Sequence, residues 1–229
     1  MIKKGLQQER EEWKRREYRR LILQAAERVI TQKGLSATTM DDFAREAGFS
    51  KATLYQYFTG KIELLLEILA NFFDEVYQGT ERISQGPSSA REKLKEGIRF
   101  YLEYNDQKEN VARMLWMDRE FREKISFFVA DERRLTSEAD LKFLDEMKQK
   151  RKATLDSVAR IIEQGVASGE LREIDVASAV MVIEALLQGF CHLRSWQEQK
   201  HTARETTDFI FEFIMKGLEK AGNTAKGES

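Results

Sequence analysis

A single proline, Pro87, in 229 residues is the feature that most limits the folds open to this chain. Proline and glycine interrupt helices, and only 13 glycines accompany that proline. Apolar residues recur at three- and four-residue steps, whereas the alternation of β-branched residues that is typical of strands is missing. The sequence therefore predicts an all-α fold, and its apolar content of 41% is enough to build a core.

We find no export or membrane signal in the sequence. The first residues lead into charged sequence, and Cys191, as the only cysteine, cannot form an internal disulfide. The longest uninterrupted apolar runs, such as 179–183, are much shorter than the roughly 18 residues of a membrane span. We therefore expect a cytoplasmic protein that has no membrane partner.

Positive charge is concentrated near the N-terminus. Residues 1–61 contain 13 Lys and Arg but 8 Asp and Glu, although the net charge of the whole chain is −1. A basic end on an acidic body favours contact with a polyanion. We expect residues 1–17 to form a charged, basic arm, either a frayed helix or a disordered segment. The alternative is a solvated helix face, because acidic residues lie among the basic ones.

Residues 40–57 have the spacing of a helix-turn-helix. Ala44 is small enough for the crossing of two helices, Gly48 tolerates a left-handed turn, and Leu54 would anchor the second helix. An ordinary helical hairpin is the alternative interpretation of this segment. Three aromatic residues would close the small core: Phe43, Phe49 and Phe58.

The segment 34–65 resembles the N-terminal domain of the tetracycline-repressor (TetR/AcrR) family of transcriptional regulators. The resemblance covers roughly residues 18–68, and its most specific part is the string Thr53-Leu54-Tyr55-x-Tyr57-Phe58-x-x-Lys61-x-x-Leu64. It implies a three-helix head that binds DNA, a variable helical body that binds a ligand, and a homodimer.

The resemblance also assigns residues to the DNA interface. Thr39 would cap the first motif helix and donate to a phosphate, and Lys51 would reach a guanine edge or a phosphate. Lys61 would lie against the DNA backbone, as a lysine does in the family. Asp41 departs from members with a basic or neutral residue there; it would accept from a cytosine amine or complement the helix N-terminus. The DNA-binding residues that the resemblance implies are Thr39, Ser50, Lys51, Thr53, Tyr55, Gln56, Tyr57 and Lys61. The basic N-terminal segment adds Arg15, Arg16 and Arg19 as expected phosphate contacts, independently of the resemblance.

The helices expected between residues 89 and 169 would enclose an effector pocket if the body follows the family architecture. Methionine and aromatic side chains form adaptable apolar walls, so the composition suits an apolar or aromatic effector. Plain core packing is the alternative for each candidate. The candidate lining residues are Tyr101, Tyr104, Met114, Met117, Phe121, Phe143, Met147, Gln188 and His192.

Two helices, expected at 175–196 and 203–220, are apolar on more than one face. Such helices need partners on several sides, and small residues spaced in multiples of four would allow a close approach. The sequence predicts a dimer interface of four helices, two from each subunit. Its candidate residues are Ala177, Met181, Ala185, Gly189, Ile210, Phe213 and Ile214.

No set of residues in the sequence points to catalysis or to metal binding. His192 and His201 are the only histidines, and with Cys191 they give no metal-ligand spacing. Adjacent helical residues point apart, so Cys191 and His192 do not form a catalytic pair. Glycine-rich phosphate loops are also missing. We therefore expect no enzymatic activity, no metal and no cofactor.

The sequence as a whole predicts a homodimeric regulator that binds a palindromic operator in double-stranded DNA and is released by a small ligand. Two alternatives remain open: a helical ligand-binding protein or enzyme that retains the head, and an activator or constitutive regulator without an effector. The expected domains are the arm 1–17, the helix-turn-helix domain 18–65, the effector-binding and dimerisation domain 66–222, and a polar tail 223–229.

Overall fold

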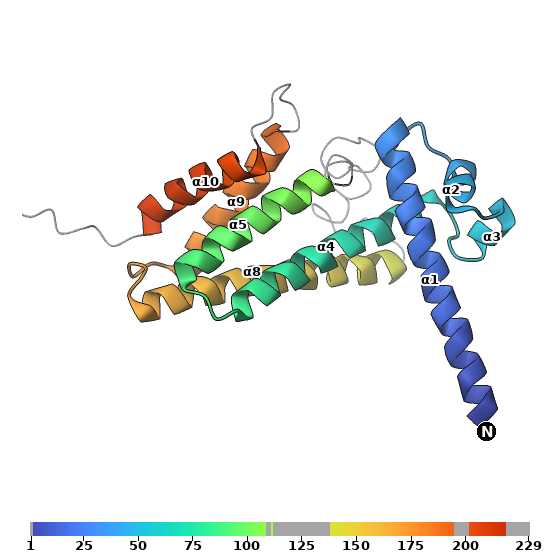
Figure 1. Cartoon of the computed structure of the whole chain (residues 1–229), viewed down its shortest axis with the longest axis horizontal. Helices are drawn as coiled ribbons and strands as arrows, with labels where there is room; N and C mark the ends of the chain where they lie inside the picture. Colours follow the sequence, from blue (N-terminus) through green and yellow to red (C-terminus); the bar gives the residue numbers. More distant parts are fainter. Residues whose placement is uncertain (1, 109–110, 112–137, 195–201, 219–229) are drawn as a thin grey trace, which may run out of the picture. The chain divides into compact units, whose positions relative to one another are not determined.

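The computed structural model describes residues 2–108, 111, 138–194 and 202–218, and every regular element in these ranges is an α-helix (Figure 1). The all-α prediction is therefore confirmed. The described residues fall into two compact units, which meet between Phe72 and Phe73 on α4. The helices are α1 (Ile2–Lys33), α2 (Met40–Ala47), α3 (Lys51–Tyr55), α4 (Lys61–Gln85), α5 (Ala90–Gln107), α8 (Glu138–Ser168), α9 (Val176–Arg194) and α10 (Ala203–Leu218).

The first unit, which we call the head, contains α1, α2, α3 and the start of α4. Helix α2 contacts both α1 and α3. Ala44 is buried in α2, Leu54 is fully buried in α3, and Gly48 ends α2 with a φ of 73°. That left-handed backbone favours glycine, and its N–H closes α2 onto the carbonyls of Ala44 and Arg45. The helix-turn-helix prediction is confirmed at each of these positions.

Helix α1 is much longer than the stretch 18–33 that the apolar pattern predicts. It runs without interruption from Ile2, so the charged N-terminal segment is helical rather than a disordered arm. Every side chain from Gln7 to Arg16 is exposed, whereas Tyr18 packs against the head and Ile22 is the first fully buried residue of the apolar stripe. Spaced charge pairs such as Glu12 and Arg16 support an exposed helix of this kind.

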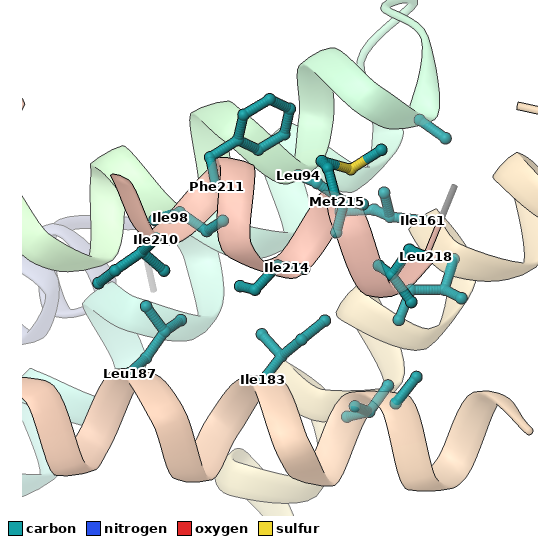
Figure 2. Close-up of a cluster of buried hydrophobic side chains, with 14 of the residues drawn as sticks. Leu94, Ile98, Ile161, Ile183, Leu187, Ile210, Phe211, Ile214, Met215 and Leu218 are labelled. Atoms are coloured by element: carbon teal, nitrogen blue, oxygen red, sulfur yellow. The ribbon is translucent and has the colours of Figure 1, made fainter. Parts of the chain in front are cut away.

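The second unit, which we call the body, is built around α5. This helix contacts α8, α9 and α10, and α8 also contacts α9. Ile183 and Leu187 of α9 point towards Ile210 and Ile214 of α10, which closes an apolar core (Figure 2). Other core residues are Leu94, Ile98, Leu102, Ile161, Ile162, Leu171, Phe211, Met215 and Leu218.

Part of α9, Val176–Leu193, is long and apolar enough to cross a membrane by length and composition alone, with a mean hydropathy of 1.6. The length of uninterrupted apolar runs did not predict this segment, because Glu184 interrupts the run. The mean hydropathy of the whole segment tolerates such an isolated charge. Core helices of soluble proteins pass the same test. In this chain Glu184 pairs with Arg151 of α8, and Ile183 and Leu187 pack into the body core.

Candidate functional site

Helix α3 presents a polar face because its one buried residue holds it to the head. Leu54 is fully buried, so the residues around it on the helix point outward, and Lys51, Tyr55 and Gln56 are exposed. The start of the helix is fixed by Ser50, whose hydroxyl accepts from the Thr53 N–H at 3.0 Å. An ammonium, a phenol and an amide on one short helix are groups that bind base edges and phosphates.

An aromatic cluster holds the end of α3 against α1. The ring of Tyr18 lies 5.0 Å from that of Phe49 and 6.1 Å from that of Tyr57, measured between centroids. Tyr57 is half-buried as a result. Its ring supports the head, and the residue lies just after α3, beside the exposed face of that helix. Tyr18 was not among the expected DNA-binding residues, although it lies on the apolar stripe of α1.

The exposed part of α1 and the adjoining α3 form a polar groove of about 520 Å³. Lys14 and Arg15 stand on the α1 side of it, and the Lys14 ammonium lies 5.6 Å from the centre of the Tyr18 ring. The α3 side contributes a hydroxyl from Thr53 and an amide from Gln56. The complete lining is Glu11, Glu12, Lys14, Arg15, Tyr18, Thr53, Gln56 and Tyr57.

Arg19 differs from its expected role as a DNA contact, because the head itself binds its guanidinium. It donates to the Tyr57 carbonyl at 2.6 Å and to both carboxylate oxygens of Glu67, and it lies 4.3 Å from the centre of the Phe58 ring. These hydrogen bonds with Glu67 raise the pKa of Arg19 further above its ordinary value. Arg19 therefore links α1, the end of α3 and α4. Arg16 is exposed and pairs with Glu12 at 4.0 Å.

Lys61 also makes contacts within the head. Its ammonium donates to the carbonyls of Leu35 at 2.7 Å and Thr38 at 2.9 Å, in the turn between α1 and α2. Carbonyls in a turn between helices have no helical partner, so they need donors from elsewhere in the chain. The lysine therefore positions the turn that leads into α2, in addition to the DNA contact that the family resemblance implies.

Two neighbouring carboxylates at the start of α2 are bound in different ways. Asp42 accepts from Lys33 at 2.7 Å and from the Thr39 hydroxyl and N–H. These bonds form a capping box with Thr39 and hold the pKa of Asp42 well below its ordinary value. Asp41 instead binds Lys51 of α3, at 2.9 and 3.1 Å from its two oxygens. The hydrogen bond to Asp41 raises the pKa of Lys51.

The head matches the family profile of bacterial regulatory proteins of the TetR family over residues 22–68. The body matches the profile of the C-terminal region of QacR-like proteins over residues 128–220. This chain belongs to the TetR family of transcriptional regulators. The matched proteins are regulators rather than enzymes.

Individual members of the TetR family align with most of the chain. The HTH-type transcriptional regulator YhgD of Bacillus subtilis is 29% identical over 205 residues, which are 87% of this chain and 96% of the relative. The HTH-type transcriptional repressor KstR2 of Mycolicibacterium smegmatis is 27% identical over 157 residues, 68% of each chain. The fold matches that of FadR from Bacillus subtilis, crystallised with stearoyl-CoA, with a TM-score of 0.64, 22% identity and coverage of 87% of this chain and 98% of FadR.

The TetR-family body has a large exposed apolar surface on α9 and α10. Phe209 and Phe213 of α10 are 70% and 62% exposed, and Met181 of α9 is 62% exposed. The small residues of α9 that were expected at an interface, Ala177, Ala185 and Gly189, are exposed as well. The prediction that Ile210 and Ile214 lie at the dimer interface is wrong. Both are buried within the subunit, because α10 turns them towards α9 (Figure 2).

The expected effector residues have several different environments. Tyr104 is buried and donates to Glu75 at 2.8 Å, and Met147 is buried in α8. Burial raises the pKa of Tyr101, and the charges of Cys191 and Glu184 of α9 raise it further. Of the remaining candidates, Phe143 and His192 are half-buried and Gln188 donates to Glu184 at 3.0 Å. Met114, Met117 and Phe121 lie outside the described residues.

Proposed function

We propose that this TetR-family protein is a repressor that binds a palindromic operator as a homodimer and is released when a small molecule with a long apolar chain binds its body. The observation that carries the proposal is α3, a short helix that buries Leu54 and presents Lys51, Tyr55 and Gln56. Repression is supported by the similarity to KstR2, which is named as a repressor. DNA is cytoplasmic in bacteria, so we place the protein there.

The groove between α1 and α3 extends the proposed interface beyond α3. Lys14 and Arg15 on one wall and the polar groups of Thr53, Gln56 and Tyr57 on the other offer the donors that phosphate oxygens accept. In this arrangement α3 would lie in the major groove, and the exposed part of α1 would follow the sugar-phosphate backbone beside it. Glu11 and Glu12 lie in the same groove and would limit how many phosphates it takes.

We place the dimer interface on the exposed surface of α9 and α10. Exposed large apolar side chains often mark a protein interface, and phenylalanine and methionine are typical of an interface centre. The small residues Ala185 and Gly189 would let α9 approach its symmetry mate, and a Cβ on Gly189 would meet nothing within 4 Å in the subunit. A two-fold axis through this surface would present two α3 helices to two half-sites.

We propose a long-chain acyl-CoA as the effector. The support is the fold shared with FadR, whose crystal structure contains stearoyl-CoA, together with the apolar side chains that α5, α8 and α9 contribute to the interior of the body. Release would be a population shift, in which the ligand favours a body conformation whose two heads no longer fit successive major grooves. Such coupling typically amounts to about 1–3 kcal/mol, or a 5–150-fold change in affinity for DNA.

Displacement from DNA tests this function. The chain is bound to a labelled duplex that it has itself selected from random sequences, and stearoyl-CoA is added, with CoA alone as the control. We expect stearoyl-CoA to lower the DNA affinity by at least about fivefold and CoA to have no effect. Equal DNA affinity with and without stearoyl-CoA would contradict this effector class while leaving DNA recognition intact.

A further inference from the structure

The ion pair between Asp41 and Lys51 joins the two helices of the helix-turn-helix. Asp41 is the second residue of α2 and Lys51 the first residue of α3. The Lys51 ammonium lies 2.9 Å from one carboxylate oxygen and 3.1 Å from the other, and the two side chains are 59% and 53% exposed. A basic residue of α3 is therefore neutralised by an acidic residue on the same surface.

Other carboxylates of the head are bound by cations that do not belong to α3. Asp42 binds Lys33 of α1 and serves as part of the α2 cap, and Glu46 binds Arg28 of α1 at 2.8 Å. These pairs hold α2 to α1. Asp41 differs because breaking its pair would free a charge on α3, the helix that we assign to DNA.

The pair is weak enough to open on contact with DNA. An ion pair between exposed side chains changes an equilibrium constant by no more than about fivefold. A phosphate that approached Lys51 would also approach the Asp41 carboxylate and be repelled by it. The pair therefore disfavours a contact between Lys51 and the phosphate backbone, which every DNA sequence offers.

Two neighbouring base edges can bind the two side chains at once, one edge for Asp41 and the other for Lys51. Successive bases along one strand are about 3.4 Å apart, close to the 2.9 Å between the ammonium and the carboxylate oxygen. In the major groove a carboxylate accepts from the exocyclic amine of cytosine, and a lysine donates to the O6 and N7 acceptors of guanine. The two side chains can thus take neighbouring base pairs after only a small separation.

We propose that Asp41 is a specificity-determining residue: it withholds Lys51 from phosphates on random DNA, and on the operator it accepts from a cytosine amine while Lys51 donates to an adjacent guanine. This inference rests on the proposed binding of operator DNA by α3. Asp41 would therefore raise the affinity for the operator and lower the affinity for other DNA sequences.

The test compares the wild type with Asp41→Asn and with the control Glu46→Gln. Both changes remove one negative charge from α2, but Glu46 is bound to α1. Affinities are measured by fluorescence anisotropy for a selected operator and for a random duplex of equal length, from 50 to 200 mM salt. Matching melting temperatures of the three proteins establish that each variant is folded.

We expect Asp41→Asn to lower the ratio of operator to random affinity by about tenfold, within the range that one side-chain contact to a base supplies. On random DNA the salt dependence should steepen by about 0.9 in the logarithmic slope for each Lys51 that gains a phosphate. Sequence selection with this variant should change the preferred base at one position of each half-site. Glu46→Gln should leave the ratio and the preferred bases unchanged.

An unchanged ratio for Asp41→Asn would overturn the inference, and so would an equal change in Glu46→Gln, because net charge would then explain the effect. In both cases the wild type still selects an operator, so the proposed function survives. A wild type that enriches no sequence would instead contradict the proposed function, and the role of Asp41 with it.

Discussion

Replacing Arg19 with methionine separates the stability of the head from its affinity for DNA. Methionine keeps an unbranched apolar side chain against Phe58 but removes the guanidinium. The variant would lose the hydrogen bond to the Tyr57 carbonyl at 2.6 Å and the pairing with Glu67. It would also leave Glu63 and Glu67 as two carboxylates one turn apart on α4, without the cation that now lies between them.

The expected loss can be worked from these contacts. The hydrogen bond from a charged donor to the Tyr57 carbonyl contributes about 1.5 kcal/mol, the lower end for a partly exposed site. Because Arg19 is 25% and Glu67 28% exposed, we take about 1 kcal/mol for the ion pair. The contact with the Phe58 ring adds about 0.5–1 kcal/mol. We therefore expect the free energy of unfolding to fall by about 3 kcal/mol, or about 1 M in the urea midpoint.

The matched control is Arg15→Met, which changes the same residue type one turn earlier on α1. Arg15 is exposed and lines the groove, and it should contribute little to stability. Urea unfolding, followed by circular dichroism, measures the stability of each variant. A salt titration of DNA binding gives the number of phosphate contacts. Arg15→Met should flatten the logarithmic salt slope by about 0.9 per subunit, whereas Arg19→Met should leave the slope unchanged.

The opposite pattern would refute this reasoning. If Arg19→Met unfolds at the wild-type urea concentration but loses a phosphate contact, its guanidinium leaves the head and binds DNA, as the sequence alone predicted. If Arg15→Met leaves the salt slope unchanged, the groove between α1 and α3 does not hold a phosphate.

Three further predictions concern the rest of the chain. Gly165→Ala should lower the free energy of unfolding, measured by urea unfolding, by about 1–3 kcal/mol, because its Cβ would lie 2.6 Å from Leu171. The control is Gly97→Ala, whose Cβ would meet no atom within 4 Å and which should not destabilise the fold. The lowered pKa of Asp42 makes its carboxylate stabilising above the ordinary value of about 3.9, so the stability difference between the wild type and Asp42→Asn should shrink as the pH falls below that value. Ala185→Glu should give monomers by light scattering with an unchanged helical content; a persistent dimer would place the interface elsewhere.

The fold was largely predictable because its signals are local. The capping boxes at Thr39, Ser89 and Thr202 each depend on a side chain three residues further on, and all three form. The turn at Gly48 needs a left-handed residue, and the burial of Leu54 follows from its place on a short helix. Patterns of this range can be read from sequence without knowledge of the tertiary structure.

The candidate site was less predictable because its charges are paired across the fold. Arg19 and Glu67 are 48 residues apart, and Lys61 lies 26 residues from the Leu35 carbonyl that it binds. The sequence shows that Arg19 and Lys61 are basic. Only the packing of α1 against its neighbours shows that the head binds their charged groups. The partner of Asp41, ten residues away on the next helix, is a similar case.

Selection of bound sequences from a pool of random duplexes, with the full chain, tests the central claim most directly. We expect enrichment of a palindrome whose half-sites have centres about 34–36 Å apart, or a multiple of that distance, as two α3 helices related by a two-fold axis require. Enrichment should disappear at 1 M salt, because phosphate contacts supply much of the affinity. A pool that remains random after repeated rounds would contradict the assignment of α3 to operator DNA.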